Sequence, residues 1–187
     1  SAEANPSDLD PDRLARLRAA GVNRLSIGVQ SFVDRELKLL GRRHDAARAA
    51  EVVHAARAAG FGRVSLDLMV GIPGQTDGSF AESPARAVEL GTDHLSLYLL
   101  EVHEGTEMDG LLRERPGLFP GEEPQRRRYL AMRERLLAAG FRHYEISNFA
   151  RPGAECRHNL RYWRCEPWLG LGPAAHSFVD GRRFAHP

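Results

Sequence analysis

The chain has 187 residues, of which 42% are hydrophobic and 27% are charged, and this ordinary composition excludes a disordered chain, a collagen and a disulfide-rich miniprotein. Its 26 Lys and Arg residues against 25 Asp and Glu residues give a formal net charge of +1, so nucleic acid is not expected as a partner. Apolar runs such as residues 95–100 are far shorter than the roughly 20 residues that cross a bilayer. We therefore expect a cytoplasmic globular protein with no membrane segment.

Helices are indicated by capping signals along the chain. Asp10 and the proline after it predict the start of a helix, because aspartate caps the first turn and proline suits the first helical position. Asp45 opens a second run with apolar residues at helical spacing. Residues 78–90 predict a weaker helix interrupted by Pro84, and Pro124 lies near the start of a fourth helix.

Each of these helices is followed by a glycine and then by a short apolar run. The four glycines are Gly21, Gly60, Gly91 and Gly140, and the four runs are residues 25–27, 64–69, 95–100 and 144–146. Glycine ends a helix in the left-handed conformation without a steric penalty. Strands that alternate with helices in this way predict βαβ units, a parallel sheet and an α/β fold. Four units are too few for a closed eight-stranded barrel, which usually needs about 250 residues, so the chain is either a short open sheet or a piece of a barrel.

Polar side chains lie at or near the ends of the expected strands. They are Gln30, Asp67, Glu101, Glu145 and Asn148. Because the carboxyl ends of parallel strands share one edge, these side chains are expected to converge on one ligand site. The segment after residue 149 is rich in glycine, proline and aromatic residues, and we interpret it as an ordered loop packed over that site.

Single residues at this expected site allow two readings each. Asp67 lies within an apolar strand, where a carboxylate is costly to bury, so it is either a ligand-binding group or a cap for the following turn. Gln30 also allows these two interpretations, but the case for a ligand-binding role is weaker, since a neutral amide is easier to satisfy within a fold than a carboxylate. Arg42 or Arg43 could bind a ligand carboxylate through two hydrogen bonds, or both could be solvated. Glu3 has no local feature that distinguishes it from a surface carboxylate.

The segment RHNLRYWR places an imidazole, an amide and two large aromatic rings within six residues. They belong to His158, Asn159, Tyr162 and Trp163. A neutral imidazole is a good ligand for haem iron, and aromatic side chains suit a flat apolar ring. The alternative is a packed loop in which His158 is a satisfied hydrogen-bonding residue.

Several motifs follow one another along nearly the whole chain: EANP, NRLSIGVQSF, LLGRRH, DLMVGIPGQT, LSLYLLEVHEGT, YEISNFARPGAECRHNLRYW and LGLGPAAHSF. Together they resemble the radical S-adenosylmethionine (SAM) proteins related to oxygen-independent coproporphyrinogen III oxidase. HNLRYW is similar to the HNxxYW motif of the HemW branch, which is described as haem chaperones. The resemblance implies part of a (β/α)6 partial TIM-type barrel, with its later βα units in residues 1–149. Residues 150–187 would form the start of the C-terminal region with the haem-binding loop.

The resemblance also implies roles for particular residues. The family's SAM contacts correspond here to Glu3, Gln30, Arg42 and Asp67, and its haem motif makes His158 the candidate ligand of haem iron. Asn159, Tyr162 and Trp163 would be the supporting residues of that haem motif. These SAM contacts suit the chemistry, because SAM presents an ammonium, a carboxylate and a ribose diol to carboxylates, an amide and a guanidinium.

One family feature is missing from the sequence. The family's [4Fe-4S] cluster is held by a CxxxCxxC loop, whereas this chain has two cysteines, Cys156 and Cys165, nine positions apart. We expect these two to be free thiols, and we expect the cluster ligands to lie outside this chain, which would then be an N-terminally truncated fragment of a longer protein.

The resemblance implies a haem chaperone that passes haem to acceptor proteins. The acceptors could include membrane-associated proteins. One alternative is an oxygen-independent coproporphyrinogen III oxidase, a dehydrogenase of porphyrin biosynthesis. The other alternative is an inactive structural fragment.

Overall fold

The computed structural model describes residues 1–186 and contains two compact units, the first Ser1–Ala154 and the second beginning at Glu155. The elements of the first unit are β1 (Ala2–Ala4), η1 (Pro6–Asp8), α1 (Pro11–Ala19), β2 (Arg24–Gln30), α2 (Asp34–Leu39), α3 (Ala46–Ala58), β3 (Arg63–Val70), α4 (Asp77–Glu89), β4 (His94–Leu99), α5 (Glu107–Glu114), η2 (Pro116–Leu118), α6 (Glu122–Ala138), β5 (Arg142–His143) and β6 (Asn148–Ala150). Those of the second unit are α7 (Arg157–Trp163), β7 (His176–Val179) and β8 (Arg182–Ala185).

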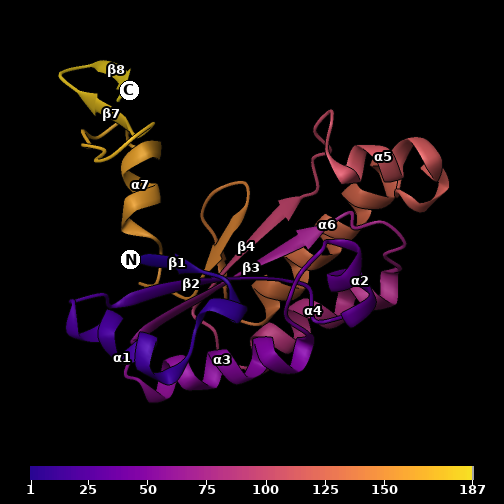
Figure 1. Cartoon of the computed structure of the whole chain (residues 1–187), viewed down its shortest axis with the longest axis horizontal. Coiled ribbons are helices and arrows are strands. Elements are labelled where there is room, and N and C mark those ends of the chain that lie inside the picture. Colours follow the sequence, from indigo (N-terminus) through magenta and orange to yellow (C-terminus); the bar gives the residue numbers. More distant parts are fainter. Residues whose placement is uncertain (187) are drawn as a thin grey trace. The chain divides into compact units, whose positions relative to one another are not determined.

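The first unit is built on one six-stranded sheet with the order β1-β2-β3-β4-β6-β5 (Figure 1). Strands β1 to β4 are parallel, with Leu66 of β3 opposite Ile27 of β2 and Leu95 of β4. The last two strands run antiparallel to their neighbours. The expected α/β fold is therefore confirmed, as an open sheet whose first four strands follow the chain order.

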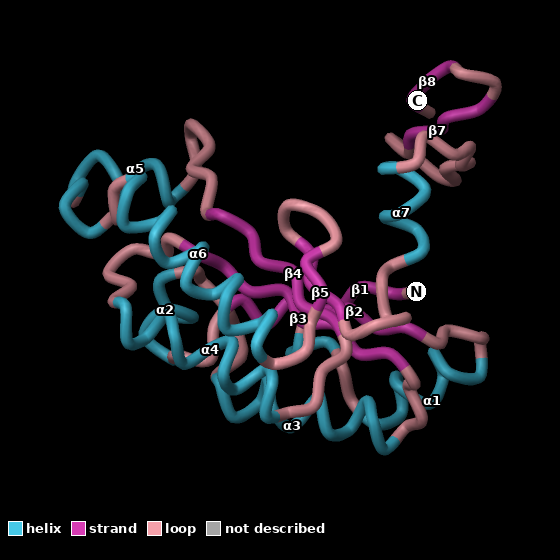
Figure 2. Tube along the Cα trace, turned by 180° about the vertical axis from the view of Figure 1, so that it is seen from behind, coloured by secondary structure: helices cyan, strands magenta, loops and turns pink. Residues whose placement is uncertain are grey.

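Helices α1, α3 and α4 cover one face of this sheet (Figures 1 and 2). The side chains on that face are apolar and fully buried, among them Leu25, Ile27, Val64, Leu66 and Leu95. Met132 and Leu136 of α6 belong to the same core. Burying a side chain of this size stabilises the fold by about 1.5–3 kcal/mol, so the helix-covered face carries the stability of the unit.

The helices begin where the capping signals predict. The Asp10 carboxylate accepts a hydrogen bond from the Arg13 N–H at 2.7 Å, and the Asp45 carboxylate accepts one from the Arg48 N–H at 2.7 Å. These bonds satisfy N–H groups that have no partner within the first turn. The expected interruption at Pro84 is wrong, because α4 is one continuous helix and Pro84 lies buried inside it.

The prediction of a fourth strand at residues 144–146 is wrong. Those residues form the turn of a hairpin between β5 and β6, which pair in antiparallel fashion. The Tyr144 N–H donates to the Asn148 carbonyl at 3.2 Å, and the Glu145 carboxylate accepts from the Ser147 N–H at 3.0 Å. These local bonds close the hairpin, so a run that resembled a buried strand folds back on itself.

The polar start of the chain also forms a strand. Residues of β1 pair in parallel with β2, and Glu3 lies opposite Ser26. The β propensity of these three residues does not predict a strand. Strand β1 forms because the edge of β2 is available for pairing.

The second unit has more regular structure than the loop expected after residue 149. Its helix α7 contains the RHNLRYW segment, and β7 and β8 form an antiparallel hairpin. The backbones of Trp168 and Phe178 exchange two hydrogen bonds of 2.9 Å and tie the intervening loop to this hairpin. Cys156 and Cys165 are not joined in a disulfide. Across residues 1–186, none of the helices has the length and apolar character needed to span a bilayer.

His94 is buried between the sheet and the hairpin turn. Its Nδ1 lies 2.8 Å from the Ser65 hydroxyl, and its Nε2 lies 2.7 Å from the Tyr144 hydroxyl. Burial, aided by the nearby charge of Arg24, lowers the pKa of His94 to about 3. The imidazole is thus neutral in the folded protein at neutral pH, with one nitrogen as donor and the other as acceptor.

Acid should destabilise the fold through His94. The unfolded chain protonates this imidazole below about pH 6.5, whereas the folded chain does not until the pH falls towards 3. The free energy of unfolding therefore decreases as pH falls through this window, by up to roughly 1.4 kcal/mol per pH unit. Urea unfolding near pH 7.5 and near pH 5 should show a larger loss for the wild type than for His94→Gln.

His54 is exposed on α3 and provides the control. His54→Gln should lose as much stability on acidification as the wild type does. Equal losses in the wild type and His94→Gln would contradict the assignment of the acid sensitivity to His94.

Candidate functional site

The face of the sheet opposite the helices carries polar side chains, and we call it the polar face. Its members in register across the strands are Glu3, Ser26, Ser65 and His94 in one row and Asp67 and Ser96 in the next. Because successive side chains of a strand point to opposite faces, these groups project together, away from the apolar core. The polar face therefore carries both Glu3 and Asp67, two of the residues for which the family resemblance implies contacts with SAM.

Asp67 lies in the middle of this face. The Ser26 hydroxyl donates to its Oδ1 at 3.2 Å, and Ser96 is a second hydroxyl partner. Burial nevertheless raises the pKa of Asp67, and the negative charge of Glu3 adds to this effect. The carboxylate is held by neutral donors, so it has acceptor capacity for further donors from a ligand.

Tyr98 is a neighbour of Asp67 that is not among the residues selected from the sequence. Its pKa is raised by burial first and by the charge of Asp67 among other groups, and it hydrogen-bonds with Ser96. The side chain is nevertheless 43% exposed. The signal that could have found Tyr98 is its spacing along β4. Ser96 and Tyr98 alternate with apolar residues, so both lie on the same face as His94.

Gln30 ends β2 in an unusual backbone conformation. Its φ of 70° lies in the left-handed region, which costs a residue with a side chain roughly 1–2 kcal/mol. The pairing of β2 with β3 shifts in register between Ile27 and Gln30. A Cβ added at Gly28 would lie 3.0 Å from the Gln30 Nε2 and 3.5 Å from the Asn5 Oδ1. The amide of Gln30 therefore lies over Gly28, on the side where the Asn5 side chain also lies.

Arg42 reaches the same place from the segment after α2. Its Nη1 donates to the Asn5 Oδ1 at 3.1 Å, so Arg42, Asn5 and Gln30 meet at one end of β1 and β2. Arg43 instead forms an exposed ion pair with Asp8 at 3.0 Å. Asn5 is not among the residues selected from the sequence, although it lies in the EANP motif, directly before the proline that opens η1.

The remaining polar residues at the strand ends have different surroundings. Glu101 is exposed, and Glu145 caps the hairpin turn. Asn148 is buried opposite Ser96, and its Oδ1 has no hydrogen-bond partner within the described part of the chain. Of these three residues, Asn148 is the one placed in register with the polar face.

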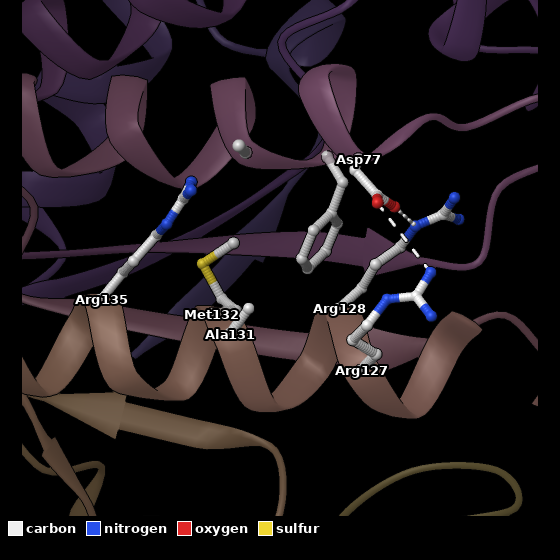
Figure 3. Close-up of a pocket in the computed structure, with 8 residues that line it drawn as sticks. Asp77, Arg127, Arg128, Ala131, Met132 and Arg135 are labelled. Atoms are coloured by element: carbon white, nitrogen blue, oxygen red, sulfur yellow. Dashed lines mark hydrogen bonds and ion pairs between the residues drawn. The ribbon is translucent and has the colours of Figure 1, made fainter. Parts of the chain in front are cut away.

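Two cavities of the first unit lie outside the polar face. One, of about 450 Å³, is lined by the end of α2, including Gly41 next to Arg42, and by the start of α5. The other, of about 240 Å³, lies between α4 and α6 (Figure 3). At one of its ends Asp77 accepts a hydrogen bond from the Arg128 Nε at 2.8 Å, and Arg127 lies 3.9 Å from Asp77. None of the candidate SAM residues lines either cavity.

The second unit places the His-Asn-aromatic segment on one short helix. His158 and Tyr162 are one turn apart on α7, with the Tyr162 hydroxyl 2.7 Å from the His158 Nε2. Tyr162 makes an edge contact with Trp168 at 4.4 Å between ring centroids. Trp163 is 58% exposed. The unit therefore presents an imidazole beside exposed aromatic surface, the combination suited to a flat apolar ligand with a metal centre.

Protein side chains alone do not form a metal centre in the part of the chain that the structure describes. No group of three or more His, Cys, Asp or Glu residues within residues 1–186 is placed to hold a metal ion. The two cysteines also fall short of the three thiolates that the family's cluster needs.

Comparison with known proteins gives consistent matches. A family model described as "Radical SAM superfamily" matches residues 1–84. The chain is 44% identical over 184 residues to "Heme chaperone HemW" of Mycobacterium tuberculosis, a match that covers 98% of this chain and 47% of that protein. The protein of the same name from Escherichia coli is 39% identical, with 96% of this chain and 47% of that protein covered. The chain thus spans about half the length of the curated relatives it matches.

A solved structure also matches nearly the whole chain. It is that of coproporphyrinogen III oxidase (HemN) from Escherichia coli, described as a radical SAM enzyme. The TM-score is 0.78 at 26% sequence identity, and the match covers 96% of this chain and 44% of that chain. The similarity supports the interpretation of the open sheet as part of a TIM-type barrel.

The left-handed backbone of Gln30 should reverse the usual preference for alanine over glycine. At an ordinary strand position alanine is more stable than glycine by roughly 0.5–1 kcal/mol. Because glycine adopts a φ of 70° without a steric penalty, Gln30→Gly should be more stable than Gln30→Ala by roughly 1 kcal/mol. Chemical denaturation of the two variants measures this difference.

Met69 of β3 serves as the matched position, since it lies within a regular strand. There the alanine variant should be the more stable of the two. If alanine were also the more stable residue at position 30, Gln30 would not be strained.

Proposed function

We propose that this chain is part of a radical SAM protein of the branch that contains HemW, and that the protein carrying it binds haem and passes it to acceptor proteins. The observation that carries this proposal is the HNLRYW helix of the second unit, where His158 lies beside Tyr162 and exposed aromatic rings. In this proposal residues 150–187 serve haem binding and residues 1–149 serve SAM binding.

The polar face fits SAM. The carboxylates of Glu3 and Asp67 can accept hydrogen bonds from an ammonium or from ribose hydroxyls, and the guanidinium of Arg42 can bind a carboxylate. Asp67 has acceptor capacity beyond its serine partners. The Gln30 amide, fixed over Gly28, supplies both a donor and an acceptor. These four side chains would bind and orient SAM.

The [4Fe-4S] cluster does not fit the residues of this chain. A cluster needs three or four thiolates, and the two cysteines here lie in the segment of the haem motif, at positions 156 and 165. Radical chemistry from SAM depends on such a cluster as the source of an electron. The role we propose for the polar face is therefore limited to binding SAM.

Haem enters the proposal as the cargo of the second unit. His158 would be the axial ligand of the iron, with Asn159, Tyr162 and Trp163 as the neighbouring residues of the motif. Trp163 and the 84% exposed Leu171 offer apolar surface for the macrocycle. Arg161 and Arg183 supply positive charge for its carboxylates. We propose a cytoplasmic protein whose acceptors are other proteins.

A coproporphyrinogen oxidase is the second candidate, and the structural match to that enzyme is the observation that favours it. That match has 26% identity, whereas the matches to the haem chaperones reach 44%. The oxidase reading also leaves the HNLRYW motif unexplained. An inactive fragment is not favoured either, because Glu3 and Asp67 lie on one face of the sheet, and Arg42 and Gln30 meet at one end of β1 and β2.

Substitution of His158 tests haem binding. In a haemin titration of the protein carrying this sequence, His158→Ala should shift the Soret band and weaken binding by about tenfold or more, because the iron loses its axial ligand. His176→Ala is the matched control, since His176 is an exposed histidine of the same unit. It should titrate as the wild type does. Identical spectra and affinities for His158→Ala and the wild type would refute the proposed ligand.

Substitution of Asp67 tests SAM binding. Asp67→Asn should weaken SAM binding by about tenfold or more in isothermal titration calorimetry, because a charged acceptor is lost. Its stability at neutral pH should rise. Burial raises the pKa of Asp67 in the folded protein, so the ionised form is destabilising above that pKa, and the neutral amide removes this effect.

Asp12 is exposed on α1 and is the matched position. Asp12→Asn should leave SAM affinity unchanged. Wild-type affinity in Asp67→Asn would exclude Asp67 as a ligand, whereas a large loss of stability would show that its charge is required by the fold.

A further inference from the structure

The His158 side chain is already engaged by a neighbour on its own helix. The Tyr162 hydroxyl lies 2.7 Å from the His158 Nε2, and the two rings meet edge to face with centroids 4.8 Å apart. The two residues are four positions apart on α7, the spacing at which helical side chains face each other. One of the two imidazole nitrogens is thus committed to a hydrogen bond.

Contacts on its other side hold Tyr162 in this position. Its ring packs edge-on against Trp168 at 4.4 Å with an interplanar angle of 84°. Trp168 in turn packs against Phe178 at 5.1 Å, and the Arg183 guanidinium lies over it at 5.5 Å. The backbones of Trp168 and Phe178 are joined by two hydrogen bonds. A phenol supported in this way is not a freely rotating surface side chain, so the position of its hydroxyl is set by the fold of the unit.

This arrangement matters for metal binding, because iron needs the unprotonated lone pair of an imidazole nitrogen. If the hydroxyl donates to Nε2, it occupies that lone pair. If Nε2 donates to the hydroxyl, then Nε2 carries the proton. In either case, an Nε2–iron bond can form only when the bond to Tyr162 breaks.

We propose that the Tyr162 hydroxyl competes with haem iron for the His158 Nε2 and thereby makes haem ligation reversible. This inference rests on the proposed function, in which haem is cargo to be released. On binding, the exposed His158 imidazole turns away from the hydroxyl and forms the iron–nitrogen bond, and water takes its place as the partner of the hydroxyl; on release, the imidazole returns to the hydroxyl. The exchange involves no change of oxidation state. Tyr162 is a positioning residue in this scheme and need not touch the iron.

The expected size of the effect follows from the strength of one hydrogen bond. A neutral hydrogen bond in a protein corresponds to roughly a twofold to tenfold change in an equilibrium constant. Removing the hydroxyl should therefore tighten haem binding by that factor and slow haem release. A purely supporting tyrosine would give the opposite sign, because its loss would disorder the imidazole and weaken binding.

The test compares four versions of the protein carrying this sequence: wild type, Tyr162→Phe, His158→Ala and the double variant. Haemin titration followed at the Soret band gives affinity, and transfer of haemin to excess apomyoglobin gives the rate of release. Phenylalanine keeps the ring that packs on Trp168, so the unit should remain folded. Tyr162→Phe should bind haemin roughly two to ten times more tightly and release it more slowly, and this gain should vanish when His158 is alanine.

Tyr129→Phe is the matched control. Tyr129 lies in the first unit, and its hydroxyl is 3.1 Å from the His143 Nε2, so this variant also removes a tyrosine–histidine hydrogen bond. Its haemin affinity and release rate should equal those of the wild type.

The outcomes separate this inference from the proposed function. If His158→Ala binds haemin as the wild type does, the proposed ligand is wrong. If His158→Ala loses binding while Tyr162→Phe equals the wild type or binds more weakly, His158 stands as the ligand and competition by Tyr162 is overturned. Loss of the Soret signature in Tyr162→Phe alone would make Tyr162 the ligand, which also overturns the inference.

Discussion

The alternation of apolar and polar side chains along β2, β3 and β4 is the constraint on which the first unit depends. Leu66 and Leu95 point to the helices and are fully buried, whereas Asp67 and Ser96 point the other way. A shift of one residue in register would exchange the two sets. The same pairing that buries the core therefore also assembles the polar face, so stability and ligand binding cannot be adjusted independently along these strands.

The second unit relies on a different kind of contact. It begins at Glu155 and has few fully buried residues, with Ser177 and Cys156 among them. Its side chains are linked by ring contacts from His158 through Tyr162 to Trp168 and Phe178. A small unit of this kind cannot bury enough apolar surface to be rigid through its core alone. The series of ring contacts that begins at His158, the proposed haem ligand, is thus also what orders the unit.

The parts of the fold that sequence could predict are those with local signals. Asp10 and Asp45 cap helices through bonds within three residues of themselves, so their role can be read without knowing the rest of the structure. Residues 144–146 mislead, because their apolar pattern resembles a strand while contacts with distant Tyr129 and His94 favour a turn. Helix α7 was missed because its stabilising contacts lie across a loop, at Trp168.

The same distinction holds for the candidate site. Asp67 could be selected as a candidate because a carboxylate inside an apolar strand is unusual, and Arg42 and Glu3 could be selected only through the family resemblance of their motifs. Asn5 and Tyr98 could not be selected, since they stand out only through their spatial neighbours: Arg42 in one case, and Ser96 with the nearby charge of Asp67 in the other. The strained backbone of Gln30 also depends on the register shift between β2 and β3, which no local pattern in the sequence records.

The order of the sheet has a consequence for how the chain can fold as it is synthesised. Strands β1 to β4 lie side by side in the order in which they are made, so each can add to an existing edge as it leaves the ribosome. More than forty residues, including α5 and α6, must then be synthesised before β6 can pair with the edge of β4. During that interval β4 presents an unpaired edge, which exposes this stage of synthesis to misassembly.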